Sequence, residues 1–110
     1  MTNGGSLVYL IIFSSLFAEI EGKYISSGEI SLEYGQPTEI FIAITNDNGI
    51  LSITTDSPMQ CKVVVRNSKG KILGNLSYNK LEIPVKKQHT YYIYAKAKSK
   101  SCNGFDIFIP

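Results

Sequence analysis

Apolar and polar residues alternate with a period of two along most of the chain after residue 28. The alternating segments are rich in Ile, Val, Tyr and Thr, and short clusters of Gly, Asn, Asp and Ser separate them, which is typical of β-strands joined by turns. We expect eight short strands, at residues 29–34, 38–45, 50–55, 60–66, 71–73, 80–86, 90–97 and 105–109. Outside the N-terminal stretch no segment has a sustained 3.6-residue apolar repeat. The sequence therefore predicts an all-β domain, a two-sheet antiparallel β-sandwich or jelly roll.

Two turns and one proline refine this prediction. Residues 46–49, with the sequence NDNG, predict a tight hairpin, because Asn-Gly tolerates the positive φ that such a turn needs. Their oxygen-bearing side chains could also suggest a calcium loop, but the twelve-residue ligand pattern that ends in Glu is absent. Residues 67–70, NSKG, predict a second hairpin with a longer loop. Pro84 removes a ladder donor and predicts an edge strand.

The inward positions of these strands define the expected core. Residues 38–45 are apolar on both sides for most of their length, as expected for a central strand that is covered on both faces. In residues 29–34 the apolar side chains, including Tyr34, should point inward and the carboxylates outward. The other predicted core residues are Ile30, Leu32, Ile42, Ile44, Leu51, Ile53, Val63, Val65, Leu81, Ile83, Tyr91, Ile93, Ile107 and Ile109.

The N-terminal stretch has the pattern of a secretory leader. Residues 7–17, LVYLIIFSSLF, carry no charge and are too few to span a bilayer. They fit the apolar centre of a signal peptide, with cleavage after Ala18 or Gly22, although residues 1–6 contain no Lys or Arg. A buried first strand or an uncleaved anchor are the alternatives. We expect residues 1–22 to be removed, which leaves a secreted single domain at residues 23–110 without a membrane span.

Two cysteines, Cys61 and Cys102, lie 41 positions apart, far outside any C-x-x-C redox or zinc spacing. In an oxidising compartment we expect them to form one disulfide, and two buried free thiols are the alternative. A metal site would need more ligands than these two residues and His89 provide. We therefore predict no metal and no cofactor.

Asn75-Leu76-Ser77 is the only acceptor triplet for N-glycosylation in the chain. Secretion in a eukaryote would make Asn75 a usable site and would place its loop on the surface. Such triplets also arise by chance.

Charge is distributed unevenly along a chain whose overall net charge is +2. Residues 23–60 carry one Lys against five carboxylates, a net charge of −4, whereas residues 61–110 carry ten Lys or Arg against two carboxylates, a net charge of +8. The mature domain is therefore dipolar. Its basic half could attract sulfated glycans, acidic lipid headgroups or an acidic protein surface.

The strand at residues 90–97 and the segment after it carry the candidate binding site. The predicted binding residues, which share one side of this strand if it extends, are Tyr92, Tyr94, Lys96, Lys98 and Lys100. Aromatic rings combined with ammonium groups suit an acidic glycan or an acidic protein surface. The same alternation would also arise on a merely solvated strand, where Lys protects an exposed edge from aggregation. Nucleic acid is disfavoured, because Lys rather than Arg dominates and a secreted domain rarely meets it.

Catalysis has little support in the sequence. His89 is the only histidine and lies at an expected turn, and the three Asp residues have no spacing that forces any two together. The motifs G-x-S-x-G, G-x-x-x-x-G-K and H-E-x-x-H are absent. We predict a non-catalytic binding module. The alternative is a secreted inhibitor or effector that acts on a protein partner through its loops at residues 46–49 and 74–79.

Residues 49–109 resemble the bacterial pre-peptidase C-terminal domain. Four pieces carry the likeness: GILSI at residues 49–53, VVVRNSKG at residues 63–70, YYIY at residues 91–94 and FDI at residues 105–107. The chain departs from the family pattern at Met59-Gln60-Cys61 and at His89-Thr90. The resemblance implies a small β-sandwich that serves as a secreted accessory module and has no catalytic residues.

Overall fold

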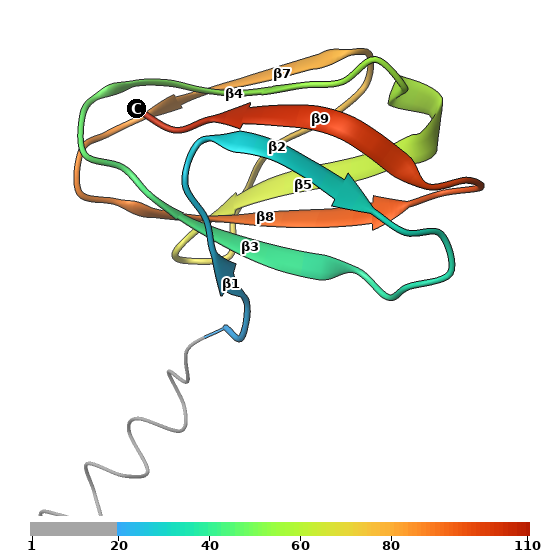
Figure 1. Ribbon diagram of the computed structural model, residues 1–110. Helices are drawn as coiled ribbons and strands as arrows, with labels where there is room; N and C mark the ends of the chain where they lie inside the picture. The colour runs from blue at the N-terminus through green and yellow to red at the C-terminus, as the bar shows by residue number, and fades with distance from the viewer. Residues whose placement is uncertain (1–19) are drawn as a thin grey trace, which may run out of the picture.

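The chain folds into two stacked β-sheets, as Figure 1 shows for the computed structural model, which describes residues 20–110 apart from the side chain of Asn103. The strands are β1 (Lys23–Tyr24), β2 (Gly28–Leu32), β3 (Glu39–Ile44), β4 (Gly49–Thr54), β5 (Cys61–Asn67), β6 (Ile72–Asn75), β7 (Lys80–Val85), β8 (Thr90–Ala97) and β9 (Cys102–Phe108). A single 3-10 turn, η1 (Pro58–Gln60), precedes β5. No helix within residues 20–110 is long and apolar enough to cross a membrane. The predicted leader falls almost entirely outside the described residues and stays a prediction.

One layer of the sandwich is a five-stranded sheet and the other a four-stranded sheet. The strand orders are β1-β3-β8-β5-β6 and β2-β9-β4-β7. The pairing of β1 with β3 is parallel, and the other pairings are antiparallel. The all-β sandwich is thus confirmed. Strand β1 was not predicted, because two residues are too few to show alternation. The edge position of β7 confirms the expectation drawn from Pro84.

The predicted hairpin at residues 46–49 is wrong. Strand β3 pairs with β8, whereas β4 pairs with β7 and β9, so this loop crosses from one sheet to the other. Neither Asn48 nor Gly49 takes the positive φ that a tight hairpin would need. The Asn48 side chain instead accepts a hydrogen bond from the Lys87 amide at 2.9 Å, which ties the loop to the β7–β8 connection.

The second predicted hairpin is confirmed. Strands β5 and β6 pair antiparallel around residues 67–70, and Gly70 takes a φ of +84°. The Asn67 side chain accepts hydrogen bonds from the amides of Lys69 and Lys71, at 2.9 and 3.0 Å. Gly and Asn therefore act here as turn residues for their usual physical reasons.

Side chains from both sheets form one apolar core. Phe105, Leu51, Ile53 and Ile93 are among its largest fully buried members. Most predicted core positions are buried, and Ile30 and Ile109 pack against the core while only partly buried. Because every second side chain of most strands is buried in this core, apolar and polar residues alternate in the sequence.

Two predicted core residues are on the surface instead. Ile44 is 50% exposed, because Phe41 and Ala43 occupy the inward positions of β3. Tyr34 is 60% exposed, because β2 ends at Leu32 and Tyr34 lies in the following turn. A strand that is apolar on both sides gives no sequence signal for which side faces inward, and β3 is such a strand.

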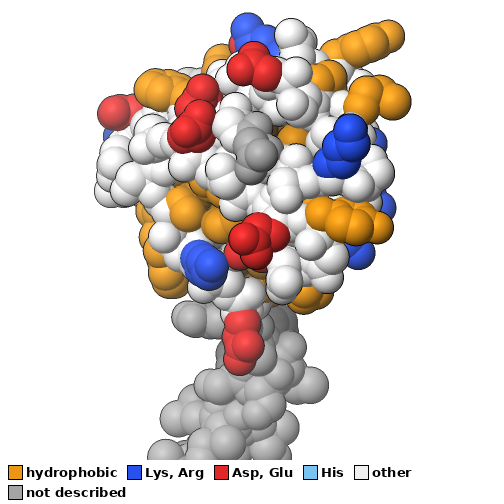
Figure 2. Space-filling model, turned by 45° about the vertical axis from the view of Figure 1, so that its right-hand side comes forward, with side chains coloured by type: hydrophobic (Ala, Val, Ile, Leu, Met, Phe, Trp, Pro, Cys, Tyr) orange, Lys and Arg blue, Asp and Glu red, His pale blue; other side chains and the backbone are white. Residues whose placement is uncertain are grey.

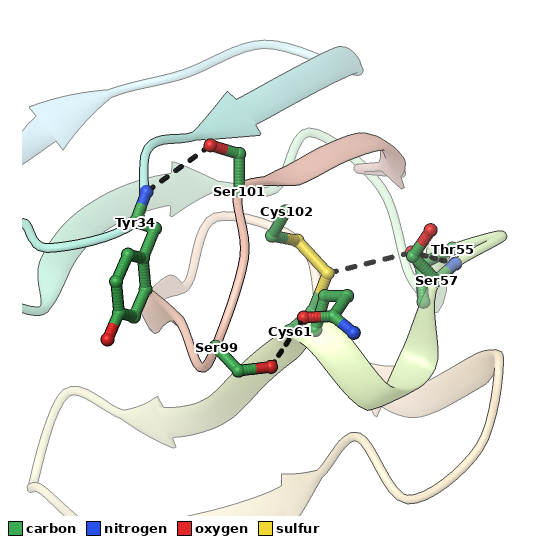
Figure 3. Close-up of a disulfide and its surroundings, with 8 residues drawn as sticks. Tyr34, Thr55, Ser57, Cys61, Ser99, Ser101 and Cys102 are labelled. Carbon is green, nitrogen blue, oxygen red and sulfur yellow. Dashed lines mark hydrogen bonds between the residues drawn. A yellow bond between two sulfur atoms is a disulfide. The ribbon is translucent and has the colours of Figure 1, made fainter.

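The Cys61–Cys102 disulfide joins the two sheets (Figure 3). Cys61 begins β5 in the five-stranded sheet and Cys102 begins β9 in the four-stranded sheet, with their Cα atoms 5.3 Å apart. Both residues are fully buried, and Thr55 Oγ1 lies 3.7 Å from the Cys61 sulfur. The predicted bridge is confirmed, and it crosses the core at one end of the sandwich.

Hydrogen bonds next to the disulfide hold the β8–β9 loop. The Lys98 amide donates to the Gln60 carbonyl at 2.8 Å, and the Ser99 hydroxyl donates to Gln60 Oε1 at 2.8 Å. On the other side of the loop the Tyr34 amide donates to the Ser101 hydroxyl at 3.4 Å (Figure 3). The segment after β8 is therefore anchored to the start of β5.

Candidate functional site

Strand β8 places three of the predicted site residues on the outer face of the five-stranded sheet. Tyr91, Ile93, Ala95 and Ala97 are buried, so the residues between them point to the opposite side. Tyr92 and Tyr94 are half-buried there and Lys96 is exposed. Strand β8 lies between β3 and β5, in the interior of its sheet. Protection of an exposed edge therefore does not explain Lys96.

The neighbouring strand β5 adds two more cations to this face. In the β5–β8 register Lys62 lies opposite Lys96, Val64 opposite Tyr94 and Arg66 opposite Tyr92. Like charges that lie directly opposite each other on one face of a sheet destabilise it. The ion pairs found among the described residues are Lys23–Glu39 and Lys80–Glu82, so neither lysine of this cross-strand pair has a carboxylate partner.

Arg66 is held in place over one of the aromatic rings. Its guanidinium carbon lies 5.4 Å from the centroid of the Tyr94 ring, within the range of a cation–π interaction. Its Nη1 also donates to the Gly70 carbonyl at 2.8 Å. The side chain is half-buried, so part of its conformational freedom is already lost before any ligand arrives.

Two adjoining hollows lie over this part of the sheet. The smaller has a volume of about 210 Å³ and is lined by Thr38, Lys62, Val64, Arg66, Ile72, Tyr94 and Lys96. The larger has a volume of about 500 Å³ and is lined by Lys62, Val63, Val64, Ile72, Asn75, Leu76 and Lys98. They share Lys62, Val64 and Ile72, and no carboxylate of the described part of the chain lines either one. We call this surface, from β8 across β5 to β6, the basic face.

Sequence reasoning placed only part of this surface correctly. Strand β8 ends at Ala97, so Lys98 and Lys100 do not continue its outward row. Lys98 lines the larger hollow, while Lys100 is exposed in the β8–β9 loop and lines neither hollow. Tyr92 is on the basic face but also lines neither.

The sequence prediction missed Lys62 and Arg66. Their signal is present in the sequence, because Val63 and Val65 are predicted core positions of one strand, which puts Lys62 and Arg66 on its other side. The alternation does not indicate which strand pairs with β8, so it could not place Lys62 and Arg66 beside Tyr94 and Lys96.

Asn75 ends β6 and is exposed at the rim of the larger hollow. The acceptor triplet therefore begins within a strand, although residues 74–79 were expected to form a loop. Leu76 is 9% exposed, and its amide donates to the Val63 carbonyl at 2.9 Å. Glycosylation of Asn75 stays a prediction.

His89 lies outside the basic face, in the β7–β8 loop. Its Nδ1 is 2.9 Å from the Lys87 carbonyl, and its ring centroid is 6.5 Å from that of Tyr91. Within residues 20–110 no three His, Cys, Asp or Glu side chains gather closely enough to hold a metal ion. His89 therefore contacts the Lys87 carbonyl and the Tyr91 ring.

The comparisons with known proteins support the fold. The structure is similar to the crystal structure of the pre-peptidase C-terminal domain of a collagenase from Bacillus anthracis, with a TM-score of 0.59. The chain has the fold of a pre-peptidase C-terminal domain. The sequences are 14% identical, and the match covers 84% of this chain and 97% of the collagenase domain. No protein-family model matches the chain, and no curated protein matches it.

The match to a pre-peptidase C-terminal domain confirms the resemblance inferred from four short sequence pieces, and it does so at the level of the fold. It also covers more of the chain than the residues 49–109 that carried the resemblance. At 14% identity the likeness assigns no residue of the basic face a role.

Proposed function

We propose that this chain is a secreted, non-catalytic recognition domain that binds an acidic glycan or an acidic protein surface through its basic face. The observation that carries the proposal is the cross-strand pair of Lys62 and Lys96, which lie directly opposite each other without a carboxylate partner among residues 20–110. A sulfate or carboxylate group placed between them would convert a mutual repulsion into two attractions. A bound acidic group would therefore be attracted by both lysines and would also relieve the repulsion between them that destabilises the sheet.

The surroundings of this pair suit a polymer better than a small buried ligand. The hollows are open to solvent, Val64 and Ile72 line both of them beside the cations, and Tyr94 adds an aromatic ring to the smaller one. Flat aromatic and aliphatic surface can contact a sugar ring or an apolar side chain while the cations engage its acidic groups. Arg66 offers a rigid fork for a bidentate contact with sulfate or carboxylate.

Two further observations support secretion and a non-catalytic role. The buried disulfide is a feature of proteins that fold in oxidising compartments, which agrees with the predicted leader. The fold is that of a domain found within a collagenase, and the family resemblance implies an accessory module rather than a catalytic one.

The test is retention of the secreted protein on heparin and on polyglutamate, eluted with a salt gradient. We compare the wild type with Lys62→Ala/Arg66→Ala/Lys96→Ala. The matched control, Lys69→Ala/Lys86→Ala/Lys87→Ala, removes the same charge from exposed residues that line neither hollow. Three partly exposed cations, at about 0.2–1 kcal/mol each, should together account for roughly a 3- to 150-fold change in affinity.

We expect the basic-face variant to elute at lower salt and the control to elute with the wild type. Equal losses in both variants would mean that net charge alone causes retention, and unchanged retention of the basic-face variant would overturn the proposal. Loss of partner binding on substitution in residues 46–49 or 74–79, with the basic face intact, would favour the inhibitor or effector alternative.

A further inference from the structure

The two outer faces of the sandwich carry opposite charge. On the four-stranded sheet Glu29 lies directly opposite Asp106, and Glu82 is exposed two strands further along. Lys80 is the cation on this face, and it is paired with Glu82 at 3.3 Å. Glu29 and Asp106 are therefore a cross-strand pair of like charges, as are Lys62 and Lys96 on the opposite sheet.

Figure 2 shows the charged and apolar side chains on one side of the molecule. Several Lys and Arg side chains lie toward the right-hand side next to exposed apolar side chains, and others lie at the top and lower left, whereas acidic side chains lie at the top, at the upper left and in the middle. The outward strand positions of the five-stranded sheet include no Asp or Glu within the described part of the chain. The division of charge along the sequence thus becomes a division between two surfaces.

Each of these surfaces also exposes large apolar side chains. Ile50 and Phe108 are exposed on the outer face of the four-stranded sheet, where Pro84 lies beside Ile50. Ile72 on β6 and Ile44 on β3 are exposed on the five-stranded sheet. Contiguous exposed apolar patches that are rimmed by polar residues mark interaction surfaces, and Ile50, Pro84 and Phe108 lie on three neighbouring strands of one sheet.

We infer that the outer face of the four-stranded sheet, defined by Glu29, Ile50, Glu82, Asp106 and Phe108 and called the acidic face below, binds the basic face of a second copy of this chain. The inference rests on the proposed function, since it names a partner for the same basic face. Stacking one copy on another would place the Glu29/Asp106 pair against the Lys62/Lys96 pair, so both repulsions would be relieved together.

The geometry of such a contact follows from sheet packing. Two twisted sheets pack face to face with their strands nearly aligned and about 10 Å apart, which is how the two layers of a sandwich already meet. The contact joins unlike surfaces, so a pair of copies keeps a free basic face on one copy and a free acidic face on the other. Association of this kind adds copies in a row instead of closing a dimer. An acidic glycan would compete with it for Lys62 and Lys96.

Sedimentation velocity of the secreted protein tests the inference, using a charge-exchange design. Variant A is Lys62→Glu/Lys96→Glu, which has two acidic faces, and variant B is Glu29→Lys/Asp106→Lys, which has two basic faces. All four positions are exposed, and far-UV circular dichroism checks the fold of each variant. Glu29→Gln/Asp106→Asn is a milder form of variant B, in case charge reversal prevents folding.

We expect the wild type to sediment faster with increasing concentration at about 0.01 M salt and to stay monomeric at about 1 M, where the Debye length falls from about 30 to about 3 Å. Each variant alone should show a dissociation constant raised by about tenfold or more, and an equimolar mixture of A and B should associate again. A wild type that stays monomeric at low salt, or variants that associate as the wild type does, would overturn the inference.

The heparin column separates the two proposals. Variant B keeps the basic face and should still be retained on heparin, whereas variant A should not. If retention on heparin depends on Lys62 and Lys96 but the wild type stays monomeric at low salt, the stacking is refuted and the proposed function stands. If variant A is retained on heparin as strongly as the wild type, both the proposed function and the stacking are refuted.

Discussion

Removing the disulfide should cost this small domain a large part of its stability. The Cys61–Cys102 bridge closes a loop of 41 residues between the two sheets. In the chain-entropy model, a loop of this length restrains the unfolded chain by about 4 kcal/mol at 25 °C. Domains of this size are stable by roughly 5–15 kcal/mol, so the bridge supplies a third or more of the total in many cases.

The assay is thermal unfolding of the wild type and of Cys61→Ala/Cys102→Ala, followed by circular dichroism. A loss of about 4 kcal/mol should lower the Tm by roughly 15–30 °C for a domain of this length. Wild type reduced in denaturant and refolded with reductant keeps both sulfurs and should show a similar decrease, which separates the cross-link from the lost side-chain volume.

Ser99→Ala is the matched control, because Ser99 is exposed and contributes one surface hydrogen bond beside the bridge. Its stability should stay within about 0.5 kcal/mol of the wild type. Both cysteines are fully buried, so reductant should act slowly on the folded protein. A double variant less than about 1 kcal/mol below the wild type would refute the view that the bridge restrains the unfolded chain.

Three further substitutions test the packing, the loop anchor and the turn. Phe105→Ala should lower the free energy of unfolding by about 3–5 kcal/mol in urea denaturation, because this side chain is fully buried between the sheets; a loss below about 1 kcal/mol would contradict that packing. Thr45 is 1% exposed, donates a hydrogen bond to the Lys86 carbonyl and accepts one from the His89 amide at 3.1 Å. Thr45→Val should therefore cost about 1–3 kcal/mol in the same assay and Thr45→Ser much less, and equal costs would show that the hydroxyl is not the anchor. Gly70→Ala should cost about 1 kcal/mol, because Gly70 has a φ of +84° and open space around it; a stabilised variant would refute the backbone argument.

The sequence predicts the local structure better than the pairing of strands. Alternation identifies every strand except β1, and the glycine turn at residues 67–70 identifies one hairpin. The Asn-Gly signal at residues 46–49 predicts the wrong partner for β3, because that loop is stabilised by the contact between Asn48 and Lys87, 39 positions away. Tertiary hydrogen bonds of this kind leave no mark in a local pattern.

For the candidate site, too, the sequence predicts the local features and not the pairing of strands. The outward direction of Tyr94 and Lys96 follows from the period of β8 and agrees with the structure. That Lys62 lies opposite Lys96 depends on the register between β5 and β8, and strands 61–67 and 90–97 could have paired in many ways. The charge imbalance between the two halves of the chain was readable, but its separation onto opposite faces depends on the order of strands in each sheet.

A titration of the ¹⁵N-labelled purified protein with a heparin oligosaccharide, followed by NMR, tests most directly whether the basic face is a recognition surface. We predict saturable shifts at the amides of β5 and β8, centred on Lys62, Arg66, Tyr94 and Lys96, that weaken as salt is raised. Shifts confined to residues 46–49 and 74–79, or shifts spread evenly over every lysine of the domain, would contradict the account.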